Sequence, residues 1–128
     1  REDFVRLLGV TLPSLRVTET GCIAGLCTSL EQFRQNGLDP AETDGVVDYA
    51  IDIQGVCMAY YLHEQEKNVT KVSFRALPPY RVDQVARQFG GGGHPQAAGC
   101  TLPMPLAQAV KEVEAALHQA LEEQKTHE

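Results

Sequence analysis

The stretch Gly90-Gly91-Gly92-Gly93-His94-Pro95-Gln96-Ala97-Ala98-Gly99 is the segment around which the rest of the chain is organised. Four consecutive glycines weaken a helix or a strand, so their use is conformational: positive φ angles and backbone N–H groups that no side chain covers. Uncovered N–H groups can form a cradle for an anion. His94 follows directly and is the only group in the stretch that can titrate near neutral pH.

The residues on both sides of this glycine block predict how it is held. Residues 82–89 carry apolar side chains at helical spacing, namely Val82, Val85, Ala86 and Phe89. Asp83 is suited to the N-cap of this helix, and Gly90 stands where a helix-terminating C′ glycine belongs. On the far side, small residues let another backbone or a ligand come close. The sequence therefore predicts a loop that extends from the end of a short anchored helix.

The glycine block alone leaves more than one interpretation open. A glycine hinge, with His94 as an ordinary polar loop residue, is the plain structural alternative, because glycine-rich motifs are often false positives. The block is not a P-loop, since no Lys-Ser/Thr pair follows the glycines. It is not a dinucleotide-binding fingerprint either, since a strand followed by G-x-G-x-x-G does not precede the helix.

Composition and charge limit the class of protein. A chain of 128 residues fits one domain, and its formal net charge of −6 argues against binding to long duplex nucleic acid while allowing a small basic pocket. The four cysteines form no C-x-x-C pair, which favours free thiols in a reducing compartment over disulfides or a zinc site. We find no signal peptide and no apolar run of membrane-spanning length, and we predict a cytoplasmic protein. The start at Arg1, without methionine, indicates a piece of a longer chain.

The first half of the sequence predicts short elements. Residues 4–15 resemble the tail of a helix that ends at Pro13. Residues 15–28 are predicted to form a hairpin whose second strand is buried. A capping box at 29–32 begins a short helix that ends at 36–37. A second helix start is predicted at 39–42, with helical turns to residue 51 that Gly45 interrupts. Because helix starts explain the acids at 39, 42 and 44, we do not assign them as metal ligands.

The second half predicts a hairpin of strands 56–62 and 70–77, with a polar turn at 63–68. Alternation places Lys71, Ser73 and Arg75 on one face of the second strand, as a basic, hydroxyl-bearing edge or simply as a solvated face. A short strand at 100–102 and a helix follow; the helix has an apolar stripe of Leu106, Val110, Val113, Leu117 and Leu121. These elements predict a single α/β domain of the α+β kind, with a mixed sheet of about five strands flanked by helices.

The order of features in the second half resembles a known family. The motifs are the strand 71–75, the helix 82–89, the glycine–histidine run 90–94 and the small-residue segment 97–101. Together they are similar to the DHH-associated C-terminal domain of DHH phosphoesterases, above all the nanoRNases and pAp phosphatases related to RecJ exonucleases. The resemblance extends from about Leu15 to Leu121 and is looser in the first half. It favours the phosphate cradle over the hinge.

The resemblance implies a domain order and a site. It implies residues 1–14 as a linker or helix tail from an N-terminal DHH catalytic domain, residues 15–122 as the substrate-binding domain and residues 123–128 as a frayed tail. Manganese, or magnesium, would bind in the DHH domain, whose Asp-His-His triplet this sequence lacks, so no catalytic or metal residue is predicted in the chain. The implied substrate and phosphate-binding residues are Arg75, Gly91, Gly92, Gly93, His94, Ser73 and Ala98.

Two functions of different classes remain open at this stage. The first is the substrate-binding half of a phosphoesterase that hydrolyses short oligoribonucleotides, pAp or a cyclic dinucleotide, with the DHH domain of the same chain as its partner. The second is a non-catalytic nucleotide-binding or regulatory module, like the related domain attached to alanyl-tRNA synthetases. A histidine after the glycines favours the phosphoesterase. No motif marks base-contacting residues, so the choice among these substrates stays open. The oligomeric state also stays open, and a dimer is one of the possible states.

Overall fold

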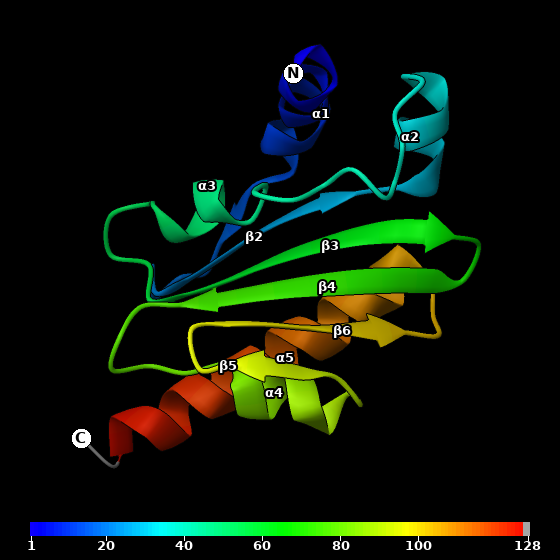
Figure 1. The fold of residues 1–128 in the computed structure, drawn as a ribbon. Helices are drawn as coiled ribbons and strands as arrows, with labels where there is room; N and C mark the ends of the chain where they lie inside the picture. The colour runs from blue at the N-terminus through cyan, green and yellow to red at the C-terminus, as the bar shows by residue number, and fades with distance from the viewer. Residues whose placement is uncertain (127–128) are drawn as a thin grey trace.

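The computed structural model describes residues 1–126, which form one six-stranded mixed sheet with helices on both faces (Figure 1). The strand order is β1-β2-β3-β4-β6-β5. The strands are β1 (Arg16–Val17), β2 (Ile23–Thr28), β3 (Met58–Glu66), β4 (Val69–Ala76), β5 (Gly92–His94) and β6 (Ala97–Leu102). Only β2 and β3 are parallel neighbours within this sheet; the other pairs are antiparallel. The predicted α+β fold is confirmed, with six strands where about five were expected.

The helices divide between the two faces of the sheet. The helices α1 (Glu2–Thr11), α2 (Leu30–Gln35) and α3 (Asp48–Ile51) lie on one face, which we call the upper face after its place in Figure 1. Their principal contacts are with β2 and β3, and α3 also reaches β4. The helices α4 (Asp83–Gln88) and α5 (Leu106–Thr126) lie on the lower face, where α4 packs on β5 and β6. The upper face of β4, β6 and β5 therefore lacks the helical layer that covers β2 and β3.

Each face of the sheet has its own hydrophobic core. Below the sheet, Tyr60 and Phe74 pack with the α5 stripe, whose buried members are Ala109, Val113, Leu117, Ala120 and Leu121. Above the sheet, Tyr61 packs with Phe33 of α2 and Leu7 of α1. The alternation along β3 explains the two cores, because successive side chains of a strand point to opposite faces.

Several predicted elements of the first half are confirmed. The hairpin at 15–28 is the antiparallel pair β1 and β2, in the register Arg16↔Gly25. The capping box begins α2: the Ser29 hydroxyl accepts from the Gln32 N–H, and the Gln32 side chain accepts from the Ser29 N–H. The helix predicted near the start is α1, which ends at Thr11 and passes into the 3-10 turn Leu12–Ser14 that contains Pro13.

Two local predictions for segments before the glycine block are wrong. No helix begins at 39–42: the Asp39 side chain instead accepts from the Ala41 N–H in a turn, and α3 starts only at Asp48. Gly45, with φ of 95°, does interrupt this segment. The polar turn expected at 63–68 is shorter, because β3 continues to Glu66 and pairs with β4 as His63↔Lys71 and Glu64↔Thr70. Ladder pairing in the sheet outweighs the low strand propensity of this polar segment.

The glycine block also differs from expectation. Gly92–His94 is a strand, β5, and β6 begins at Ala97, so Pro95-Gln96 is the turn of a hairpin and the block is not a long loop. Pairing with β6 supplies the stability that glycine lacks on its own. The helix α5 continues to Thr126, which is four residues into the tail expected to fray; residues 127–128 of that tail lie outside the described residues. All four cysteines are free, with Cys100 buried and the other three half-buried.

Glu64 connects the two helical layers. One carboxylate oxygen accepts from the Leu30 N–H at the start of α2, at 2.9 Å, and the other accepts from the Leu106 N–H at the start of α5, at 3.3 Å. The first turns of both helices have unpaired N–H groups and a partial positive charge, which a carboxylate satisfies. A single side chain thus caps one helix on each face of the sheet.

We expect Glu64→Ala to lower the free energy of unfolding by about 1–2 kcal/mol, because two helix starts lose their acceptor. Urea denaturation followed by circular dichroism measures the change. Glu64→Gln, which keeps one acceptor oxygen, should lose less. The matched control is Glu66→Ala, at an exposed position two residues along β3. Equal losses in the Glu64→Ala and Glu66→Ala variants would show that the two caps contribute nothing.

No helix within residues 1–126 combines the length and the apolar character needed to cross a membrane.

Candidate functional site: the open half of the sheet

Strand register brings four of the predicted site residues together on the upper face of the open half of the sheet: Arg75 and Ser73 of β4, and Gly92 and His94 of β5. One row across the three strands consists of Arg75 of β4, Ala97 of β6 and His94 of β5, because Ala97 pairs with Arg75 on one side and with His94 on the other. Ser73, Gly99 and Gly92 form the adjacent row. Directly opposed residues of neighbouring strands share a face, and the intervening β4 residues Val72 and Phe74 are buried in the lower core. Arg75 and His94 therefore flank Ala97 at a backbone separation of about 10 Å, two strand spacings.

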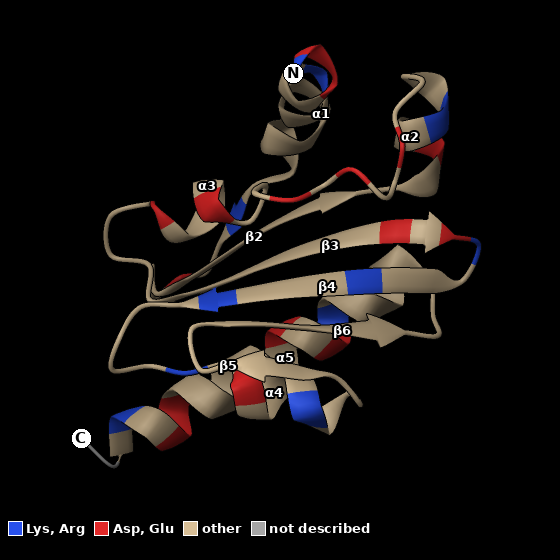
Figure 2. Ribbon diagram, viewed as in Figure 1, with Lys and Arg blue, Asp and Glu red and all other residues tan. Residues whose placement is uncertain are grey.

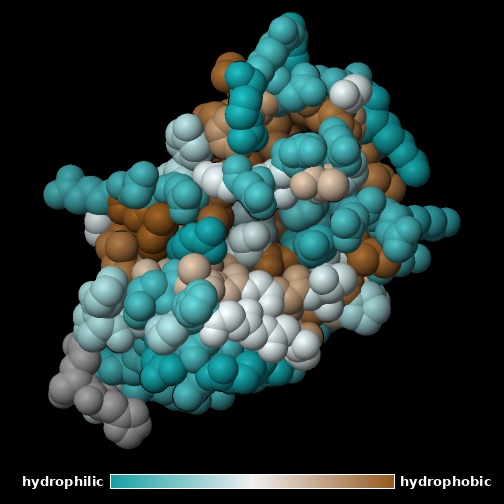
Figure 3. Space-filling model, in the orientation of Figure 1, coloured by the Kyte–Doolittle hydropathy of each residue, from teal (hydrophilic) through white to brown (hydrophobic). Residues whose placement is uncertain are grey.

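The floor between Arg75 and His94 consists of small residues. Ala97 and Gly99 of β6 and Gly92 of β5 carry at most a methyl group, so a ligand can approach the backbone closely. A Cβ added to Gly92 would meet nothing within 4 Å, which shows that this position faces open space. In the space-filling view, pale residues of intermediate hydropathy form a band over β5 and β6 (Figure 3). We call this surface the shelf: Ala97, Gly99 and Gly92 form its floor, and Arg75 and His94 lie at its two sides.

The other glycines of the block have a packing role. A Cβ on Gly91 would lie 2.1 Å from the Gly99 carbonyl oxygen, and one on Gly93 would lie 2.7 Å from the Ala97 carbonyl oxygen. The Gly91 N–H already donates to the Ala86 carbonyl at the end of α4, at 2.9 Å. Gly90, with φ of 85°, ends α4 as predicted for a C′ glycine. Gly91 therefore does not offer its N–H to a ligand, and of the three predicted cradle glycines only Gly92 has open space above it.

Ala98 does not face the shelf. Its side chain is 8% exposed and packs in the lower core, because it lies one residue out of phase with Ala97 and Gly99. The residues of β6 that form the floor are thus Ala97 and Gly99, which the sequence reasoning did not select. The period-two pattern of 97–102, with Ala98, Cys100 and Leu102 buried, is the signal that would have identified them.

Arg75 is oriented by α3. Its Nε lies 3.4 Å from Asp48 Oδ1, and its Nη1 donates to the Phe74 carbonyl at 3.0 Å. The Arg75 side chain is 31% exposed and Asp48 is 55% exposed, so the ion pair is loose and remains open to solvent. The planar guanidinium has five N–H donors, which leaves several free to bind a phosphate oxygen. His94, at the other end of the row on the edge strand β5, is exposed.

A buried carboxylate stabilises the first turn of the helix before the glycine block. Asp83 is the first residue of α4 rather than its N-cap, which is Val82. Arg81 binds both Asp83 oxygens at 2.9 Å, and Arg87 binds Oδ2 at 2.6 Å. The hydrogen bonds from Arg81 are the main reason why the pKa of Asp83 falls to about 2. The carboxylate stays ionised at neutral pH and holds the helix from which the glycine block begins.

Charge is unevenly distributed over the protein. Figure 2 shows two basic bands on β4, and the acidic residues of the upper part of the molecule lie mainly on α1, α2, α3 and the segments between them. Arg75 and Lys71 lie on the same face of β4 as the shelf, in a chain whose net charge is −6. An anion would find its favourable potential locally, over the shelf, instead of over the whole surface.

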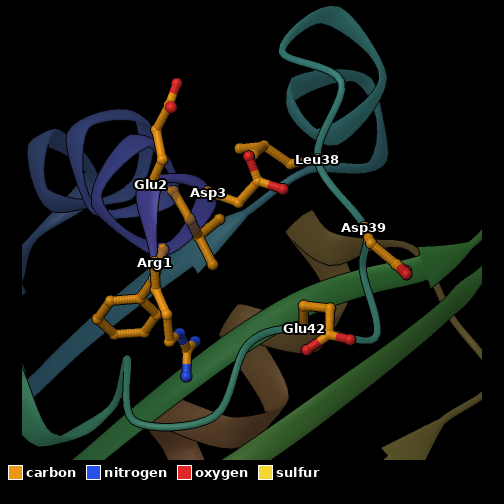
Figure 4. A pocket seen from close by; sticks show the side chains of 8 residues that line it. Arg1, Glu2, Asp3, Leu38, Asp39 and Glu42 are labelled. Carbon is orange, nitrogen blue, oxygen red and sulfur yellow. The ribbon is translucent and has the colours of Figure 1, made fainter.

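The shelf lies apart from three open pockets on the surface of the molecule. A pocket of about 680 Å³ lies between the start of α1 and the segment 38–42, where Figure 4 shows Glu2, Asp3, Asp39 and Glu42 around it. Two pockets of about 640 Å³ lie beside β1 and α5. None of the predicted site residues lines any of these three. Among residues 1–126, no group of three or more His, Cys, Asp or Glu side chains is placed to hold a metal ion.

Comparisons with known proteins place the chain in a family. Residues 21–123 match the family model of the DHHA1 domain. An exopolyphosphatase-related protein from Bacteroides fragilis has the same fold, with a TM-score of 0.84 and 26% identity over 93% of this chain and 35% of that protein. A pGpG-specific phosphodiesterase from Vibrio cholerae has a TM-score of 0.62 and 15% identity over 94% of this chain and 39% of that protein. No curated protein matches the sequence significantly.

The family match covers strands β2 to β6, α4, the glycine block and most of α5, so it includes every residue of the shelf. The chain spans little more than a third of the length of these two solved structures. DHHA1 domains accompany DHH domains in phosphoesterases that act on nucleotide substrates. The resemblance inferred from the glycine–histidine motif is confirmed: the chain belongs to the DHHA1 domain family of the DHH phosphoesterases.

Proposed function

We propose that this chain is the substrate-binding domain of a metal-dependent DHH phosphoesterase that hydrolyses short oligoribonucleotides or pAp. The observation that carries the proposal is the row Arg75, Ala97 and His94, in which two donors flank a floor without bulky side chains. Arginine is suited to bidentate binding of phosphate, and the flat floor allows a sugar or base to lie against the backbone. The family membership of the chain supports this assignment.

Each side chain has a distinct role in the proposed complex. Arg75 donates to phosphate oxygens while Asp48 limits the directions in which its guanidinium can point. His94 donates from the opposite end of the row, and the Ser73 hydroxyl is available beside Gly99. Manganese or magnesium in an accompanying DHH domain would activate the attacking water and stabilise the leaving oxygen. The shelf itself binds and orients the phosphate.

We expect the phosphate group to dominate binding, so that the 128-residue chain binds AMP more tightly than adenosine in calorimetric titrations. Arg75→Ala and His94→Ala each remove a charge-assisted or polar contact, and AMP affinity should fall about 10-fold for each. The matched control is Arg34→Ala, an exposed arginine on α2, which should leave affinity unchanged. A melting curve for each variant separates lost contacts from lost folding. Equal affinities of the Arg75→Ala and Arg34→Ala proteins would contradict the proposal.

A non-catalytic nucleotide-binding module, or half of a cyclic-dinucleotide phosphodiesterase, would use the same shelf. Hydrolysis separates these functions. When the domain is assayed together with its DHH domain, the proposed function requires turnover of short linear oligoribonucleotides or pAp that depends on added manganese or magnesium. Binding without turnover would favour the non-catalytic module. Turnover of cyclic dinucleotides alone would favour the cyclic-dinucleotide phosphodiesterase.

A further inference from the structure

The basic face of β4 extends beyond the proposed phosphate site. Lys71 lies four residues before Arg75 on the same face, opposite Thr101 of β6. The side chains of Lys71 and Thr101 are both exposed. Lys71 and Thr101 thus form a third row, next to the row of Ser73 and Gly99 and on the side away from Arg75. The two blue bands on β4 in Figure 2 show this separation of the two basic residues.

The surroundings of Lys71 leave its charge uncompensated. None of the ion pairs found within residues 1–126 includes Lys71. Its neighbour across the β3–β4 pair is His63, which is buried. Burial, followed by the Lys71 charge, lowers the pKa of His63 to about 4, so the imidazole is neutral at pH 7 and adds no second charge. The Lys71 ammonium group, which has no carboxylate partner among these ion pairs, and the neighbouring Thr101 hydroxyl are two donors suited to bind an anion.

The separation along β4 corresponds to more than one nucleotide. Four residues of strand cover about 13 Å. A sugar–phosphate chain advances about 3.4 Å per nucleotide in a stacked duplex and roughly twice that, about 7 Å, when it is fully extended. The span from Arg75 to Lys71 therefore equals two extended internucleotide steps. The intervening row, Ser73 and Gly99, has no bulky side chain to block the path of the strand.

We propose that Lys71 and Thr101 form a second phosphate subsite, which binds the phosphate two steps along an extended single strand from the phosphate at Arg75. This inference rests on the proposed function and adds a length requirement to it: the second subsite is used only by ligands with three or more phosphates in a chain. A mononucleotide or a dinucleotide with two phosphates would not reach it. The shelf would then favour trinucleotides over shorter ligands.

The test is a titration of the 128-residue chain with pA, pApA and pApApA at two salt concentrations. We expect pApApA to bind about 10-fold more tightly than pA, since it gains one charge-assisted contact. Lys71→Met, which keeps the apolar stem, should abolish this gain, and Thr101→Val should reduce it. For pApApA, Lys71→Met should also lower the salt dependence of log affinity by about 0.7, the value for one phosphate contact in a single strand.

The matched control is Lys67→Met, in the exposed turn between β3 and β4, which should retain the full gain. Equal binding of pApApA by the Lys71→Met and Lys67→Met proteins would overturn the second subsite, and so would equal affinity of the wild-type chain for pA and pApApA. Failure of the proposed function gives a different result. In that case the wild-type chain would not bind pA at all, or would bind it without dependence on Arg75.

Discussion

Gly91→Ala is expected to lower the free energy of unfolding by about 3 kcal/mol, the upper part of the range for overpacking. The added methyl would lie 2.1 Å from the Gly99 carbonyl oxygen and 2.8 Å from the Cys100 Cα. Both are backbone atoms, which cannot rotate away as the end of a flexible side chain could. Relief would require β5 to move away from β6, which breaks the pairing that orders the glycine block. For a domain of this size, the melting temperature should fall by roughly 10 °C.

The matched control is Gly92→Ala, at the following residue, which is the first of β5. A methyl group there enters open space, and the backbone does not have the positive φ that disfavours alanine. We expect its melting temperature to stay close to that of the wild type, while AMP binding weakens because the methyl occupies the floor of the shelf. Thermal melts and titrations of both variants thus separate a packing glycine from a binding-site glycine. A stable Gly91→Ala protein would show that β5 and β6 are not as closely packed as described.

Acid should destabilise the protein through His63. The imidazole is 4% exposed, stacks on Tyr61 and meets the edge of Phe33, and its Nδ1 has no hydrogen-bond partner in the described part of the chain. Burial is the main cause of its low pKa of about 4, against about 6.5 in an unfolded chain. Between these values the unfolded state binds more protons, so stability falls as the pH decreases from 6.5 to 4 and levels off below. The full loss is about 3 kcal/mol.

Urea denaturation at pH 7 and pH 4.5 measures this effect. His63→Phe removes the titrating group and keeps a ring of similar shape, so its loss of stability between the two pH values should be smaller than that of the wild type by about 2–3 kcal/mol. Because carboxylates titrate in both proteins, the difference between the proteins isolates His63. His118→Gln, at an exposed position on α5, is the control and should follow the wild type. If the stability of the wild type and of the His63→Phe variant depended on pH in the same way, His63 would not be the cause of the acid destabilisation.

Local patterns in the sequence predicted the parts of the site that depend on a single strand or helix end. The alternation of Lys71, Ser73 and Arg75 with buried residues was visible in the sequence, as was Gly90 as a C′ glycine, because period-two burial and helix termination are local. The identity of the family was also accessible, since it depends on motif order along the chain.

Features that depend on strand pairing or on contacts between distant segments were not predicted. Glycine propensity argues against a strand, and β5 exists only because β6 pairs with it. The alternation along residues 97–102 separates Ala98 from Ala97 and Gly99, but it assigns faces only once this segment is known to be a strand. The role of Glu64 was hidden for the same reason, because the two amides that it accepts from lie 34 and 42 residues away.

The topology of the chain explains why one half of the upper face is bare. The parallel neighbours β2 and β3 need a crossover connection, and α2 and α3 belong to that crossover, which lies over these two strands. The hairpins β3–β4 and β5–β6 need only tight turns, and α4 and α5 occupy the other face. Upper-face positions of β4, β6 and β5 therefore belong to neither hydrophobic core. Except at Gly99, where a Cβ would lie 2.9 Å from the Val72 carbonyl oxygen, side chains on this surface can change at little cost to the two cores, so one scaffold can carry different ligand preferences.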